Sequence, residues 1–179
     1  MPSFAQAHPG HIGQAQSFGN GLAHPFSGLD HLCAMLAVGL WAAQLGGRMR
    51  WLLPMTFVTV MLAGGVLGLN GVNIPVAEQG IAASLLVLGI FIAAAVRLPT
   101  MAGMVVVGLF ALFHGYAHGA EMPASAAGVS YAFGFVTASA SLHLIGLGLG
   151  LAAQRLDVSR WIRFAGAGIA ACGIYFCGA

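Results

Sequence analysis

Apolar residues fill this chain in six runs of about 20 residues or more, separated by short turns that contain glycine, asparagine or proline. About 20 apolar residues in a helix cross the hydrocarbon core of a bilayer. The runs cover residues 25–45, 51–70, 76–96, 99–119, 126–153 and 159–177. The pattern predicts an all-α fold, a polytopic bundle of six transmembrane helices over residues 24–179.

Composition agrees with a membrane protein, since 59% of the residues are hydrophobic and only 6% are charged. A soluble domain usually has about 25% charged residues. The chain lacks lysine and has a net charge of only +2, so it has no basic patch and we expect no nucleic-acid partner. Its 27 glycines, many of them three or four residues apart, predict helices that pack closely among membrane lipids.

The arginines follow alternate runs, so all of them are expected on one side of the membrane. They are Arg48, Arg50, Arg97, Arg155, Arg160 and Arg163. The connections on the other side hold only Asn70, Asn73 and Glu121 as notable polar residues. By the positive-inside rule the arginine side is cytoplasmic, which predicts that both termini are periplasmic.

Residues 1–23 have no hydrophobic periodicity and are interpreted as an exposed periplasmic arm. Ala5-Gln6-Ala7 has the form of a signal-peptidase site, which would make residues 1–7 a signal-peptide remnant and His8 the mature start. An ordinary alanine-containing tail is the alternative. His8 and His11 on this arm are possible sites of metal capture.

The first run opens with HPFSGLDHLCAM, residues 24–35, which places His24, Asp30 and His31 inside an apolar segment. A carboxylate is expensive in hydrocarbon and is usually retained there with a partner and a function. On a continuous helix, His24, Ser27, His31 and Met35 would share one face, with Asp30 beside it. His24 has a structural alternative to a functional role, because it precedes Pro25 and could simply cap the helix.

Further polar residues are expected near the same level of the membrane. His114 and His118 are four residues apart, the spacing by which one helix presents two imidazoles to a metal. When depth is counted from the arginines at 1.5 Å per residue, Glu78 reaches this level too. His143 lies about 7 Å deeper and could be a second binding position on a path inward. The alternatives are that His114 and His118 form a hydrogen-bonded pair, that Glu78 is a first-turn acid stabilised by the helix dipole, and that His143 is an ordinary core histidine.

Imidazole and carboxylate donors suit divalent nickel, cobalt, zinc or iron, and the same groups can also relay protons. Met35 is more often a core residue than a ligand, and Glu121 is interpreted as a loop charge. The three cysteines lack metal-site spacing and are interpreted as small core residues. The candidate metal ligands are therefore His24, Asp30, His31, His114, His118, His143 and Glu78.

Several motifs together resemble the HupE/UreJ family of nickel-related membrane proteins. They are His24-Pro25 through Gly28, Asp30-His31, Ala34-Met35, Val38-Gly39, Phe113-His114-Gly115, Ala117-His118-Gly119 with Glu121 and Pro123, Leu142-His143, and the His8-Pro9-Gly10-His11 start. The resemblance implies a bacterial inner-membrane protein that supplies nickel, or alternatively cobalt, to the maturation proteins of hydrogenase or urease. It also carries a ligand role over to His24, Asp30 and His31.

These observations favour secondary transport of a divalent metal ion, with nickel as the substrate and cobalt or zinc as alternatives. No nucleotide-binding motif is present, so transport would be driven by a gradient or a partner. An intramembrane zinc hydrolase that uses the histidines with Ser27 is the second hypothesis. Haem binding by histidines on facing helices is a third.

Overall fold

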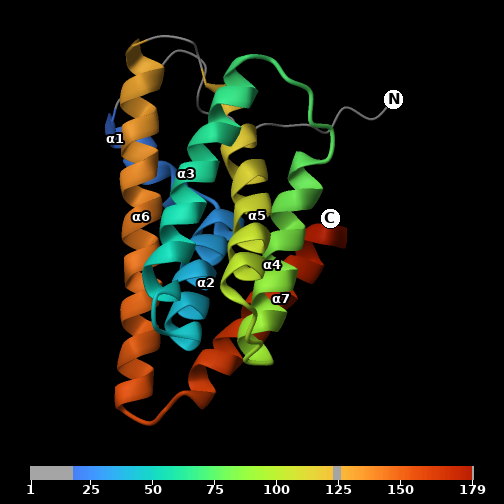
Figure 1. The fold of residues 1–179 in the computed structure, drawn as a ribbon. Helices are drawn as coiled ribbons and strands as arrows, with labels where there is room; N and C mark the ends of the chain where they lie inside the picture. The colour runs from blue at the N-terminus through green and yellow to red at the C-terminus, as the bar shows by residue number, and fades with distance from the viewer. Residues whose placement is uncertain (1–17, 123–125, 179) are drawn as a thin grey trace.

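A computed structural model describes residues 18–122 and 126–178, which form helices and short connections with no strand among them. Figure 1 shows the helices as an elongated bundle. They are α1 (Phe18–Ser27), α2 (Leu29–Leu45), α3 (Met49–Leu69), α4 (Ala77–Ala93), α5 (Thr100–Glu121), α6 (Ala126–Arg155) and α7 (Arg160–Gly178). The all-α prediction is confirmed.

Four of these helices, α3, α5, α6 and α7, are long and apolar enough to cross a membrane, and the bent pair α1–α2 is equivalent to a fifth. Helix α4 is apolar but has only 17 residues. Large hydrophobic side chains such as Met55, Val105 and Leu149 are more than half exposed on the outside of the bundle. The chain therefore fits a multi-pass membrane protein with four or five candidate spans of full length, and the six expected spans are not confirmed.

The expectation of one continuous helix over residues 25–45 is wrong. Helices α1 and α2 meet at Gly28 with a bend of 86°. Gly28 is extended, with φ −106° and ψ 122°, and its carbonyl already accepts the amide of Leu32, in the first turn of α2. The Ser27 hydroxyl donates to the His24 carbonyl and so closes α1 on itself. Discontinuous helices of this kind are common in transporters.

The expected boundary of the N-terminal arm also moves. Residues 18–23 form the first turns of α1, and Gly21 is buried against the backbone of α6 at Tyr131. Pro25 lies inside α1, not at the start of a helix, so His24 does not cap one. The rest of the expected arm, residues 1–17, lies outside the described residues.

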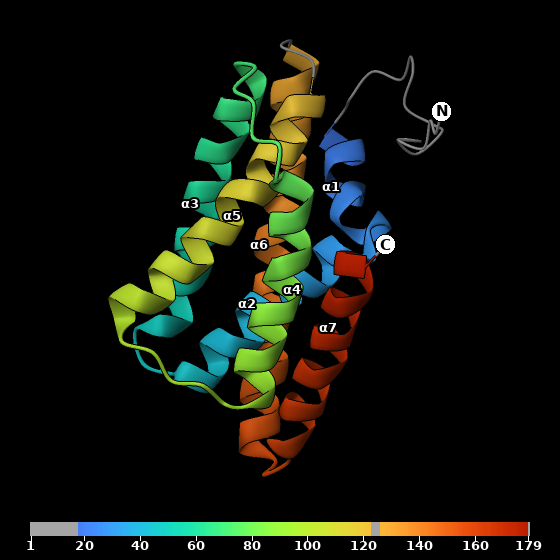
Figure 2. The ribbon, with the colours of Figure 1, turned by 90° about the vertical axis from the view of Figure 1, so that its right-hand side faces the viewer.

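All six arginines gather at one end of the bundle, because the α2–α3, α4–α5 and α6–α7 connections meet there (Figures 1 and 2). The predicted turn at Gly46-Gly47 has left-handed backbone at both residues, with φ of 72° and 51°. Only glycine adopts this conformation without strain. A core that includes Trp41, Phe57 and Leu85 fills the bundle above this end.

Helices α3 and α5 touch through their backbones. Gly64 and Gly68 of α3 face carbonyl oxygens of α5, and Gly115 and Gly119 of α5 face carbonyl oxygens of α3. Helices α4 and α7, side by side in Figure 2, use Gly89 and others in the same way. Without a hydrophobic force between helices in lipid, such close contact supplies the association.

Gly115→Ala is expected to lower the melting temperature of the purified protein, because its added Cβ would collide with the Met61 carbonyl. Overpacking of this kind typically costs about 1–3 kcal/mol. Gly65→Ala is the control, since its Cβ would lie 3.6 Å from the nearest atom, the Gly115 oxygen. Equal melting temperatures of the two variants in the same detergent would contradict the close contact.

Candidate metal centre

Four histidines meet inside the bundle, from three helices. His31 of α2 lies at the centre, with its ring centroid 4.6 Å from that of His118 and 5.2 Å from that of His114, both on α5. His24 of α1 is 4.7 Å from His118 and 6.2 Å from His31. The break at Gly28 brings α1 back toward α5, so these imidazoles meet although α1 and α2 are not one straight helix.

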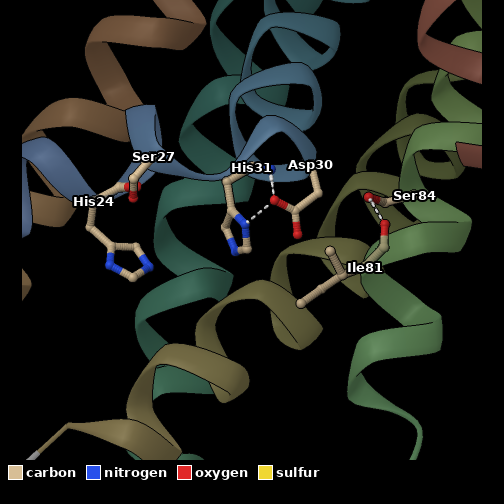
Figure 3. Close-up of polar contacts among 6 residues, drawn as sticks. All are labelled: His24, Ser27, Asp30, His31, Ile81 and Ser84. Atoms are coloured by element: carbon tan, nitrogen blue, oxygen red, sulfur yellow. Dashed lines mark hydrogen bonds and ion pairs between the residues drawn. The ribbon is translucent and has the colours of Figure 1, made fainter. Parts of the chain in front are cut away.

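Asp30 orients the central histidine. Its Oδ1 accepts hydrogen bonds from the His31 Nδ1, at 2.9 Å, and from the His31 backbone amide, at 2.8 Å. Figure 3 shows both contacts in the first turn of α2, with His24 approaching from the other side of the break. Because Nδ1 donates to the carboxylate, the Nε2 of His31 keeps a free lone pair, as in carboxylate–histidine–metal arrangements.

A backbone carbonyl has the same effect on His114. Its Nδ1 lies 2.9 Å from the Phe110 oxygen, so the proton sits on Nδ1 and leaves Nε2 as an acceptor. The Nε2 atoms of His31, His114 and His118 are all buried without a hydrogen-bond partner. Buried polar atoms are rarely left unpaired in proteins, so three together indicate an unfilled requirement for a ligand.

The ring separations fit shared coordination. A nitrogen bound at about 2.0–2.1 Å places the centroid of its ring about 3.2 Å from the metal. Two imidazoles at angles of about 90–110° around one ion then have centroids about 4.5–5.2 Å apart. Three of the four measured separations fall in this range. In residues 18–122 and 126–178, however, no three His, Cys, Asp or Glu side chains are arranged to hold a metal ion.

Gly28 leaves the space that the Asp30–His31 pair needs. A Cβ at this position would lie 2.6 Å from Asp30 Oδ1 and 3.3 Å from His31 Nδ1. The backbone angles of Gly28 are open to any residue, so the requirement for glycine comes from space alone. Asp30 and His31 could be singled out from their place in an apolar segment, whereas no sequence pattern assigns this role to Gly28.

His143 stands apart from the cluster. It is fully buried on α6, and both of its ring nitrogens lack a partner, as does the hydroxyl of Ser139 one turn earlier. Phe57 of α3 lies between the histidine cluster and His143, with its ring centroid 5.5 Å from that of His114 and 4.9 Å from that of His143. Sequence reasoning missed Phe57, because one phenylalanine in an apolar run carries no signal of its own.

Glu78 is also separate from the four histidines. It is exposed in the first turn of α4, and together with Asp30, Gln79 and Cys177 it lines a hollow of about 310 Å³. Asp30 thus has the histidine cluster on one side and this hollow on the other. Met35 is fully buried, as expected for a core residue, and Glu121 is exposed but is the last residue of α5 and not part of a loop.

The comparisons with known proteins agree with the motifs. The family model described as HupE / UreJ protein matches residues 1–176. Protein HupE of Rhizobium leguminosarum bv. viciae is 47% identical over 139 residues, which is 78% of this chain and 72% of that protein. No solved structure matches. The chain belongs to the HupE/UreJ family.

Proposed function

We propose that this protein is a secondary transporter of a divalent transition-metal ion, with nickel as its substrate, in the inner membrane of a bacterium. The observation that carries the proposal is the set of three buried, unpartnered Nε2 atoms around His31. Neutral imidazoles in a water-poor site favour a borderline metal ion over calcium or magnesium, which prefer oxygen ligands. Family membership supports nickel, the metal that the resemblance implies.

The arrangement of polar groups supports a route through the bundle. An ion attracted by Glu78 would enter the hollow beside Asp30 and then bind the imidazoles of His31, His114 and His118. Phe57 would have to turn aside before the ion reached His143, toward the arginine-rich end. With that end in the cytoplasm by the positive-inside rule, the route leads inward, to where hydrogenase or urease maturation proteins would receive the metal.

The direct test is uptake of radioactive nickel into proteoliposomes that contain the purified full chain. Accumulation above that of protein-free vesicles, with competition by cobalt but not by magnesium, is the expected result. Anomalous scattering from crystals soaked with nickel would then place the ion. A signal confined to the protein surface, with none among the four histidines, would contradict the proposed centre.

A further inference from the structure

The arginine-rich end of the bundle contains a hollow of about 430 Å³. Its polar residues come from six different segments of the chain and are Gln44, Arg50, Arg97, Gln154, Ser159 and Arg163. No aspartate or glutamate lines it, and no arginine forms an ion pair with a carboxylate anywhere in residues 18–122 and 126–178. Three guanidinium groups therefore line one space without a carboxylate partner.

Helix ends hold the lining side chains in place. Gln154 donates from Nε2 to the Ala43 carbonyl at 2.8 Å, and Arg163 donates from Nε to the Ala93 carbonyl at 2.7 Å. These bonds span 111 and 70 residues of sequence, so they belong to the folded bundle and not to local turns. Arg163 is thus oriented through Nε, which leaves the terminal nitrogens of its guanidinium for a ligand.

Arg50 provides the second sign of a built site. Its Nε atom is buried and has no hydrogen-bond partner in the protein. A buried donor on a charged group is costly to leave unpaired, so an acceptor that enters the hollow would recover this free energy. An ordinary solvated arginine, which only marks the cytoplasmic side of a membrane protein, does not need to bury this atom.

We infer that this hollow binds a phosphate group. Guanidinium forks match the oxygens of a phosphate in pairs, and three of them balance more than one negative charge. The ligand is the headgroup phosphate of an anionic phospholipid or free inorganic phosphate. Position favours the lipid, because Trp51 and Trp161 at the same end are each 59% exposed, as tryptophans are at the level of the headgroups.

The site has a consequence for a cation that passes this end of the bundle. The three arginines that line the hollow repel a divalent ion, whereas a bound phosphate neutralises their charge. The inference does not depend on metal transport, however, because phosphate binding is measured without any metal. Failure of one proposal is therefore distinguishable from failure of the other.

The test is native mass spectrometry of the purified full chain, titrated separately with phosphatidylglycerol and with inorganic phosphate. Binding is expected to weaken at least tenfold in the double variant R50Q/R163Q. The matched control is R48Q/R155Q, which removes the same charge at the same end from two arginines that do not line the hollow, and it should bind as the wild type does.

Each arm gives a decisive outcome. Binding of phosphatidylglycerol supports a lipid site, and binding of inorganic phosphate alone supports a site for the free anion. Equal weakening in the two double variants would overturn the inference, because the effect would then be net charge only, and so would an absence of binding in both titrations. If R50Q/R163Q is not monodisperse, R50K/R163K keeps the charge but loses the forks, and wild-type affinity in that variant would overturn the inference equally.

Discussion

Nickel uptake by His31→Ala is expected to fall to the level of protein-free vesicles. Among the described residues, His31 is the imidazole that lies close to both His114 and His118, with ring centroids 5.2 Å and 4.6 Å away, so its loss removes the centre of the cluster. Asp30→Asn should retain some uptake, because it keeps the ligands but weakens the orientation of His31. Loss of an outer-shell partner typically costs about 10–100-fold in metal affinity. Initial rates in proteoliposomes, over a range of nickel concentrations, separate the two effects.

Ser84→Ala is the matched control for this prediction. Ser84 is fully buried on α4 near Asp30, and its hydroxyl donates to the Ile81 carbonyl of its own helix at 2.6 Å (Figure 3). It is a polar residue inside the bundle with its bonding already satisfied, so its removal should leave uptake within about twofold. Undiminished uptake by folded His31→Ala and Asp30→Asn would exclude the cluster as the transport site.

Much of the bundle could be predicted because hydrophobic length and turn chemistry are local properties of the sequence. The turns at Gly46-Gly47 and Asn70-Gly71 follow from glycines that adopt left-handed backbone, and the common end of the arginines follows from alternation of the helices. The i, i+4 pair His114 and His118 does lie buried on one face of α5. The turn after Met122 includes residues 123–125, which lie outside the described residues.

The break between α1 and α2 could not be predicted in the same way. Gly28 lies in an apolar run that reads as continuous, and glycine is common inside the membrane helices of this chain. The break depends on the hydrogen bonds on either side of Gly28. The Ser27 hydroxyl donates to the His24 carbonyl of α1, and the Asp30 carboxylate accepts from the His31 amide of α2. The role of Phe57 was equally hidden, because it depends on two histidines from other helices.

Among residues that are not proposed metal ligands, Gly28 is expected to have the strongest effect on nickel uptake when it is replaced. Gly28→Ala should lower nickel uptake at least as far as Asp30→Asn does, although every proposed ligand is retained. The added Cβ would lie 2.6 Å from Asp30 Oδ1, so the carboxylate must leave the His31 Nδ1 and its amide, and the imidazole loses its fixed tautomer. The same initial-rate assay measures the loss, and circular dichroism checks that the helices are retained.

Gly148→Ala gives the comparison that separates a local effect from a general cost of replacing membrane glycines. Gly148 lies on α6, where an added Cβ meets nothing within 4 Å, so uptake and melting temperature should stay at wild-type values. In Gly28→Ala, by contrast, uptake should fall while the melting temperature stays near the wild-type value, because the nearest atom is the end of the flexible Asp30 side chain and not backbone. If Gly28→Ala transported nickel as Gly148→Ala does, the Asp30–His31 contact would be dispensable, and the orientation of the central histidine would have to come from elsewhere.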